Sequence, residues 1–288
     1  MTPVTSVGVS LADHGVVGEL SWPSDGAASF PGVLVFGGSE GGLTGSSFMA
    51  RALAEEGFCA LALAYFGAPG LPAELTNVPV EYLEKGVQFL ATHPRVAARR
   101  VGALGISKGA EAVLLLASRD PAIAAVVAGV PSHVCWQGIN RANFADPSAS
   151  WTAGGKPVAF VPYDFSKPFV SVLDLYQRSL PHETGSSAEI PVERICGPIV
   201  LVAGEDDTLW PSAHMCRLME ARLAANKFPH SVETLIYPQA GHGAFGPPVP
   251  PGHPFEQLDA LGGTMAGNSA ARADSWTRSL EVLRSALQ

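Results

Sequence analysis

The chain has 288 residues and a net charge of −8, and 47% of its residues are hydrophobic while only 15% are charged. The negative charge excludes an overall field that would attract nucleic acid or an anionic membrane surface, so an anionic ligand needs a local positive patch. No apolar run is long enough for a membrane-spanning helix. The high apolar content suits a sheet buried on both faces.

The four cysteines lack the paired spacing of metal-binding or redox motifs. Cys59 lies in an apolar run, which predicts buried thiols in a reducing compartment. The first residues show neither a basic leader nor an apolar signal core, so we expect a cytoplasmic protein. His214 and Cys216 have no companions at zinc-ligand spacing, and we predict neither a metal nor a cofactor. The sequence does not indicate an oligomeric state.

The predicted elements begin with two strands and then alternate between strand and helix. Alternating apolar residues predict strands at 4–11 and 16–22, joined by a turn at Asp13-His14-Gly15. The elements that follow are strand 32–36, helix 46–56, strand 58–64, helix 80–91, strand 101–104 and a helix that ends at residue 117.

The alternation stops after strand 123–130. Residues 131–191 contain several prolines and little periodicity, which predicts an inserted cap over a functional site. The alternation then resumes with strand 197–203, helix 211–226, strand 231–237 and helix 268–287. This order predicts one α/β domain with a mostly parallel, doubly wound sheet, in which ligands bind at the carboxyl ends of the strands.

Ser107 is the candidate nucleophile. It lies in Gly105-Ile106-Ser107-Lys108-Gly109, where an apolar strand turns directly into an apolar helix. A G-x-S-x-G turn in that context holds the serine hydroxyl above the sheet, at the positive end of the helix. The pattern recurs at Gly37–Gly41 around Ser39, but further glycines follow and no helix can begin at once. We expect this second segment to be a loop that donates backbone N–H groups to an oxyanion hole.

A serine hydroxyl needs a base to accept its proton and an acid to orient that base. Candidates follow later strands: Asp206 and Asp207 come after strand 197–203, and His242 comes after strand 231–237. The order serine, aspartate, histidine is that of the α/β hydrolases. His242 would then act as general base and acid, and the oxyanion would be bound by the backbone N–H groups of Lys108 and of Ser39 or Gly38.

Each of these residues also has a structural interpretation. A histidine between glycines can simply form a turn, and either aspartate can cap the next helix. Taken alone, each residue favours the structural interpretation, because a motif match is only a hypothesis. Three residues in the right order, each after its own strand, favour catalysis.

The chain resembles the C-terminal catalytic domain of acyl-CoA thioester hydrolases and bile acid-CoA:amino acid N-acyltransferases, with dienelactone hydrolases as more distant relatives. The resemblance covers residues from about 30 to the C-terminus and is carried by GISKGAE, LVFGGSEGG, GEDDTLWPS, AGHG, WTAGGKPVAFVPY and LGGT. It implies an α/β-hydrolase fold and a small acyl thioester substrate such as an acyl-CoA. By the family pattern the catalytic acid is Asp207.

The resemblance and the motifs together predict a serine hydrolase that cleaves an acyl thioester or ester through an acyl-enzyme. Family members that transfer the acyl group to amino acids usually carry cysteine at the position of Ser107, so serine favours hydrolysis. The alternatives are an acyltransferase or cyclase with an amine or alcohol acceptor, and a hydrolase fold retained only for binding. The expected residues of the acyl pocket, all in the predicted cap, are Trp136, Trp151 and Tyr163. The expected cations for CoA are Lys108, Arg141 and Lys156.

Overall fold

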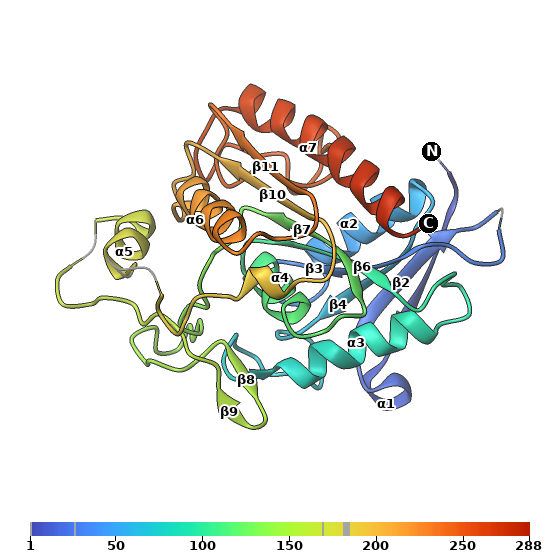
Figure 1. Ribbon diagram of the computed structural model, residues 1–288, viewed down its shortest axis with the longest axis horizontal. Coiled ribbons are helices and arrows are strands. Elements are labelled where there is room, and N and C mark those ends of the chain that lie inside the picture. Colours follow the sequence, from blue (N-terminus) through green and yellow to red (C-terminus); the bar gives the residue numbers. More distant parts are fainter. Residues whose placement is uncertain (1, 26, 169, 181–184) are drawn as a thin grey trace.

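The computed structural model describes residues 2–25, 27–168, 170–180 and 185–288, and within them eight strands form one sheet (Figure 1). The strand order is β1-β2-β4-β3-β6-β7-β10-β11. β2 pairs antiparallel with both of its neighbours, and all the other pairs are parallel. The strands are β1 (Val4–Val9), β2 (Val17–Pro23), β3 (Gly32–Phe36), β4 (Cys59–Ala64), β6 (Val101–Ile106), β7 (Ile123–Gly129), β10 (Ile199–Gly204) and β11 (Val232–Tyr237). The mostly parallel sheet is confirmed.

Helices cover both faces of the sheet. Successive side chains of a strand point to opposite faces, so a strand made of apolar residues has to be covered on both. In β3, Val33 and Val35 pack in one apolar cluster, whereas Leu34 and Phe36 pack in another. The first cluster includes residues of α2 (Thr44–Glu55) and α7 (Met265–Ala286). The second includes residues of α3 (Val80–Thr92), α4 (Lys108–Ala117) and α6 (Ser212–Ala225). Within the described residues, no helix is both long and apolar enough to cross a membrane.

The first strand pair differs from the prediction in its connection. β1 pairs antiparallel with β2 as expected, from Val4 opposite Pro23. The strand predicted for residues 4–11 ends at Val9, however, and α1 (Leu11–His14) forms a single helical turn in place of the simple hairpin. The Ser10 side chain accepts a hydrogen bond from the N–H of Asp13, which is the geometry of a helix N-cap.

Residues 131–191 contain little regular structure. They include β8 (Trp151–Ala153), β9 (Lys156–Pro157) and α5 (Val172–Ser179), and the short 3-10 helix η1 (Val192–Arg194) follows them. β8 pairs with β5 (Val78–Pro79). Residues 169 and 181–184 of the predicted cap lie outside the described residues. The aromatic cluster of this segment packs against Trp210 and Met215, next to the loop that follows β10.

The chain order of the central strands creates a place for a ligand. After β3 the chain continues to β4 on one side, and β6 then adds on the other side of β3. The loops after β3 and β6 therefore diverge, and such a switch point leaves a crevice at the carboxyl end of the sheet. Ser39 follows β3, Ser107 follows β6, Asp207 follows β10 and His242 follows β11. All four candidate residues are consequently at the same edge.

Candidate active site

Ser107 has the strained backbone of a nucleophile elbow. Its φ is 56° and its ψ is −122°, a conformation that residues with a side chain seldom adopt. The Ser107 N–H donates to the carbonyl of Gly129 at 2.9 Å, which ties the turn to the end of β7. A Cβ at Gly105 would overlap the carbonyl of Gly109, and a Cβ at Gly109 would overlap that of Gly37. The close contact of strand, turn and helix explains why both flanking positions are glycine.

The turn places Ser107 at the N-terminus of α4. The N–H groups of Ala110 and Glu111 donate to the Ser107 carbonyl at 2.9 and 3.1 Å, so the helix begins immediately after the serine. Lys108 is the first residue of α4. The first N–H groups of a helix have no partner inside it, and the helix dipole makes this end favourable for negative charge.

Asp207 and His242 form a buried pair. His242 Nδ1 lies 2.9 Å from Asp207 Oδ2, and both side chains are almost fully buried. Asp206, by contrast, is exposed. Three further groups donate to the Asp207 carboxylate, namely the Ser212 hydroxyl at 2.6 Å and the N–H groups of Leu209 at 2.9 Å and Trp210 at 3.3 Å. This set of donors fixes the position of the carboxylate beside His242.

The loop that carries His242 is held by the segment just before α7. The His242 N–H donates to the Leu261 carbonyl at 3.0 Å. The buried Asn268 side chain accepts from the Gly241 N–H at 2.9 Å and donates to the Gly262 carbonyl at 3.0 Å. Asn268 was not identified from the sequence, although the nearby LGGT motif belongs to the resemblance. Its side chain fixes the loop because it satisfies backbone groups on both sides.

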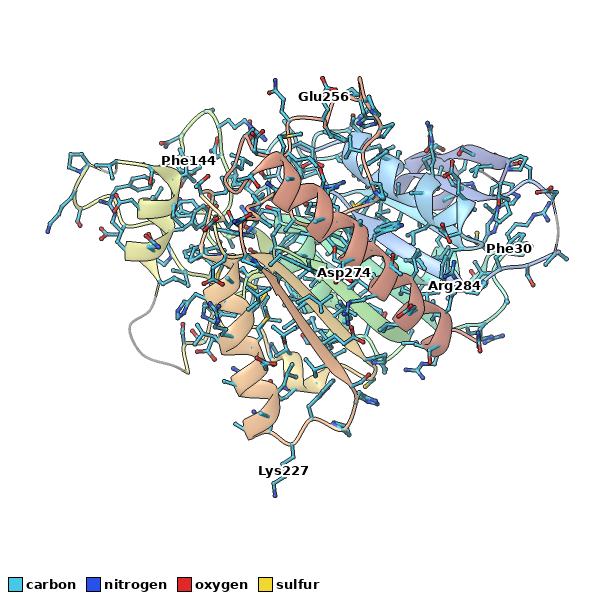
Figure 2. All side chains as sticks on the ribbon, turned by 90° about the horizontal axis from the view of Figure 1, so that it is seen from above. Phe30, Phe144, Lys227, Glu256, Asp274 and Arg284 are labelled. Atoms are coloured by element: carbon cyan, nitrogen blue, oxygen red, sulfur yellow. The ribbon has the colours of Figure 1, made fainter. Side chains whose placement is uncertain are left out.

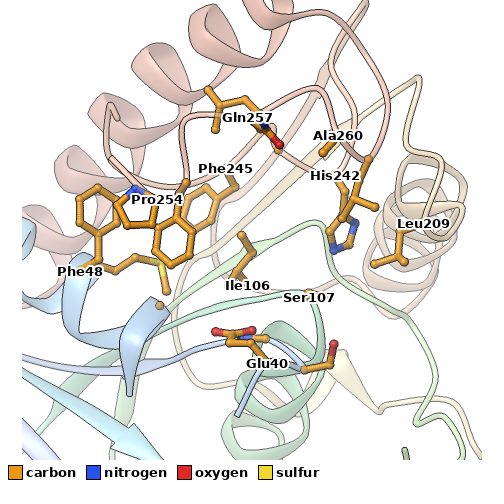
Figure 3. A pocket seen from close by; sticks show the side chains of 18 of the residues that line it. Glu40, Phe48, Ile106, Ser107, Leu209, His242, Phe245, Pro254, Gln257 and Ala260 are labelled. Carbon is orange, nitrogen blue, oxygen red and sulfur yellow. The ribbon is translucent and has the colours of Figure 1, made fainter. Parts of the chain in front are cut away.

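Ser107 and His242 line one cavity of about 620 Å³, within the range of small-molecule sites (Figure 3). Gly38 and Ser39 contribute to the same wall. Figure 3 shows Ser107, His242 and Leu209 at one end of the cavity and an apolar group at the other. The apolar lining consists of Phe48, Met49, Ile106, Leu209, Phe245, Pro254, Phe255, Leu258, Ala260 and Leu261. The structure therefore brings the predicted serine, histidine and glycine-rich loop to one cavity.

Glu40 also lines this cavity, and no function was predicted for it. Its Oε1 accepts a hydrogen bond from the Gly38 N–H at 3.1 Å. The side chain lines the cavity, and desolvation of its carboxyl group by the surrounding protein atoms raises the pKa of Glu40 above 4.5. Its position inside the motif LVFGGSEGG was the feature of the sequence that could have indicated a place at the site. Because Glu40 occupies the N–H of Gly38, Ser39 is the better candidate of the two for donating to an oxyanion.

The side chain of Lys108 is not available to an external anion. Its Nζ donates to both oxygens of Glu111, at 2.7 and 2.8 Å, and to the Ser150 hydroxyl at 2.9 Å. The Lys108 side chain is 1% exposed and that of Glu111 is 0% exposed. Burial raises the pKa of Glu111, against the opposing effect of the Lys108 ammonium group. The expectation that Lys108 supplies charge for CoA was wrong, because this residue neutralises a buried acid.

Within the described residues, the lining of the cavity does not include Trp136, Trp151 or Tyr163. All three belong to the core, where Trp151 Nε1 donates to Glu111 Oε1 at 2.7 Å and the Trp136 N–H donates to the same oxygen at 3.2 Å. Tyr163 stacks on Trp136. The expectation that these residues line the acyl pocket was wrong: the Trp151 ring bonds α4, and the rings of Trp136 and Tyr163 pack in a cluster with Trp210 and Met215.

Sequence comparison gives a match to the family described as BAAT / Acyl-CoA thioester hydrolase C terminal, over residues 78–288. Among curated proteins, acyl-coenzyme A thioesterase 5 of Mus musculus is 31% identical over 88% of this chain and 59% of its own length. The peroxisomal succinyl-coenzyme A thioesterase of Mus musculus is 30% identical over 88% of this chain and 60% of its own length. Bile acid-CoA:amino acid N-acyltransferase of Mus musculus is 31% identical over 96% of this chain and 64% of its own length. The chain thus spans about three fifths of these relatives.

Solved structures share the fold at low sequence identity. A dienelactone hydrolase-like promiscuous phosphotriesterase from metagenomic libraries superimposes with a TM-score of 0.62, at 18% identity, over 100% of this chain and 99% of its own. The dienelactone hydrolase of Anabaena variabilis ATCC 29413 gives a TM-score of 0.54, at 18% identity, with the same coverage of 100% and 99%. These likenesses show an α/β-hydrolase fold. With the sequence match over most of its length, the chain belongs to the family of BAAT and acyl-CoA thioester hydrolase C-terminal domains.

Proposed function

We propose that the protein is a serine hydrolase that cleaves an acyl thioester through an acyl-enzyme on Ser107. The observation that carries the proposal is the buried pair of His242 and Asp207, joined at 2.9 Å, with His242 lining the same cavity as Ser107. A binding module has no need for a strained serine and a fixed histidine. The non-catalytic alternative is therefore the weaker one.

The chemistry follows from these positions. His242 accepts the Ser107 proton as the serine oxygen attacks the thioester carbonyl, and Asp207 stabilises the imidazolium that forms. Backbone N–H groups of Ser39 and Lys108 bind the oxyanion, the latter aided by the helix dipole. The carbon–sulfur bond breaks, and the thiolate leaves with the proton of His242. Water then attacks the acyl-serine, with His242 again as base, and the carboxylic acid leaves while Ser107 regains its proton.

Arg141 supports an anionic leaving group. It lines the cavity, and its guanidinium donates to the Ser39 carbonyl at 2.5 Å and to Glu74 at 3.2 Å. Its side chain is half exposed, so part of the cation faces solvent at the mouth. Lys156, the other expected cation, is exposed in β9 and does not line the cavity within the described part of the chain. The proposed substrate is an acyl-CoA, as in the names of the thioesterase relatives.

Transfer to an amine is the second candidate, because an N-acyltransferase of amino acids matches 96% of this chain. Ser107 favours water as the acceptor, since an acyl-serine is an ordinary ester that water activated by His242 can attack. Transfer would require a cavity that excludes water. We also propose the cytoplasm as the compartment, since all four cysteines are free thiols and three of them are buried.

Thiol release from acyl-CoA, followed with and without glycine and taurine, tests the proposal. We expect free thiol and free acid as the products and covalent labelling of Ser107 by a fluorophosphonate. Ser107→Ala should lose activity by about 10⁶-fold without unfolding, whereas Ser39→Ala should change it little because only its backbone is used. A dominant amide product would establish the transferase alternative. Equal losses at the two serines would contradict the assignment of the nucleophile.

A further inference from the structure

The apolar end of the cavity is built by two parts of the chain that flank the candidate site. One part is α2, which contributes Phe48 and Met49. The other is the segment 243–261 between His242 and α7, called here the histidine-loop extension, which contributes Phe245, Pro254 and Phe255. Figure 3 shows Phe48, Pro254 and Phe245 together at the end opposite His242. From residues 131–191, as far as the structure describes them, only Arg141 lines the cavity.

Aromatic contacts join the two parts. The Phe48 ring centroid lies 4.4 Å from that of His253 and 5.9 Å from that of Phe255. His253 and Phe255 are themselves 5.2 Å apart. These separations are typical of interacting rings. The three rings therefore form one cluster, which we call the aromatic wall, and two of them, Phe48 and Phe255, line the cavity.

The base of the histidine-loop extension is fixed by Arg272 of α7. Its guanidinium donates to the carbonyls of Gly243 at 3.3 Å, Phe245 at 2.5 Å and Pro247 at 2.8 and 3.0 Å. Burial lowers the pKa of Arg272 to about 10, so it remains protonated at neutral pH. A cation shared among three carbonyls holds the extension in place. The position of the far end of the cavity is therefore fixed by the folded structure.

We infer that the cavity between α2 and the histidine-loop extension binds the acyl chain, and that the aromatic wall of Phe48, His253 and Phe255 limits its length. The inference rests on the proposed function. It assigns acyl selectivity to this wall and not to Trp136, Trp151 and Tyr163, whose rings pack in the core. The ligand is a straight, uncharged acyl chain, because Phe48, Met49, Phe245 and Phe255 line this end of the cavity, and Arg272, which also lines it, already donates to backbone carbonyls.

The experiment compares Phe48→Ala and Phe255→Ala with wild type, and uses Phe144→Ala as a matched control. Phe144 stacks on Tyr163 and does not line the cavity within the described residues. Figure 2 shows it beside α5, well apart from Glu256 of the histidine-loop extension. All three changes remove one aromatic ring that is part buried, so loss of packing is matched. Thermal unfolding verifies that each variant is folded.

The first measurement is kcat/KM for straight-chain acyl-CoA esters from acetyl to palmitoyl. We expect Phe48→Ala and Phe255→Ala to move the optimum to longer chains, with about a fourfold gain for each further methylene that becomes buried. Phe144→Ala should keep the wild-type profile. An unchanged profile in both cavity variants, with thioesters still cleaved, would overturn the inference and leave the proposed function intact. A shift in Phe144→Ala equal to that in the cavity variants would also overturn it.

The second measurement separates the two proposals. Calorimetric titration with straight-chain carboxylates, which are the products of the proposed reaction, reports acyl binding without turnover. If no thioester is cleaved but carboxylate affinity rises with chain length and the limit moves in Phe48→Ala, the proposed function fails and the inference stands. If neither thioester cleavage nor chain-length-dependent binding is observed, both proposals fail.

Discussion

Replacing Lys108 by methionine should destabilise the fold through the acid it leaves behind. Methionine keeps the backbone N–H and an unbranched side chain one atom shorter, and removes the ammonium group with its hydrogen bonds to Glu111 and Ser150. Glu111 then stays fully buried, with the Trp151 indole and the Trp136 N–H as its remaining donors. Breaking a buried ion pair by removing one partner costs about 3–5 kcal/mol. The unfolding entropy of a chain of 288 residues is roughly 0.6 kcal/mol per degree, so we expect a loss of about 5–8 °C in Tm.

The deficit should depend on pH with a definite sign. Burial raises the pKa of Glu111 in the folded state above its usual 4.5, and loss of the Lys108 charge raises it further. A carboxyl whose folded pKa is raised contributes most stability when both states are protonated. That contribution is lost as the pH rises from 4.5 through the raised pKa. The Tm difference from wild type should therefore be small in acid and reach its full size at alkaline pH.

The assay is thermal unfolding followed by circular dichroism across this pH range. Lys156→Met, which removes an exposed lysine in β9, is the matched control and should stay close to wild type. Adding Glu111→Gln to Lys108→Met should recover part of the loss at alkaline pH, because no buried charge then remains. A pH-independent deficit, or one equal to that of the control, would refute the view that Lys108 exists to neutralise Glu111.

Two further predictions concern acidic residues of the site. Asp207→Asn should lower kcat about 10³–10⁴-fold while Asp206→Asn changes it little, because Asp207 bonds His242 and Asp206 is exposed. Steady-state rates of the two variants test this, and a larger loss at Asp206 would contradict the assignment of Asp207 as the acid. Glu40→Gln should gain stability relative to wild type as the pH rises above 4.5, because desolvation disfavours the ionised carboxyl group. The Tm of both proteins measured against pH tests this, and a relative loss of stability at high pH would show that the charge stabilises the loop.

Local patterns were sufficient to predict the central sheet and the positions of the candidate residues. The central parallel strands β3, β4, β7 and β10 are continuous apolar runs, and the helices α2 and α3 have apolar residues on one face. Ser107 could be separated from Ser39 because strand, turn and helix are contiguous in the sequence. The helical turn at Leu11–His14 was missed, since a single turn has too few residues to show a periodicity.

Side-chain partners were not predictable to the same extent, because they depend on segments far apart in the chain. Glu111 is only one helical turn from Lys108, but the residues that bury this pair, among them Ser150 and Trp151, come from residues 131–191, so the local sequence does not show that Lys108 is unavailable to an external phosphate. Asn268 likewise acts on Gly241 across 27 residues. A polar side chain shows its function only when the fold has determined which backbone groups it must satisfy.

The position of the cavity is the feature that the sequence predicted least well. Aromatic residues in an irregular insertion predicted a cap that lines the site, and the same residues equally well fill a second apolar core. In the structure Trp136 and Trp151 lie in the core, where Glu111 on α4 accepts hydrogen bonds from the backbone N–H of Trp136 and from the indole of Trp151. The proline-rich extension after His242 carries no regular periodicity, yet Arg272 and Phe48 give it a fixed form. Recognition of the acyl group is therefore assigned to the loop that also carries the proposed catalytic base, and changes in this loop should alter selectivity and rate together.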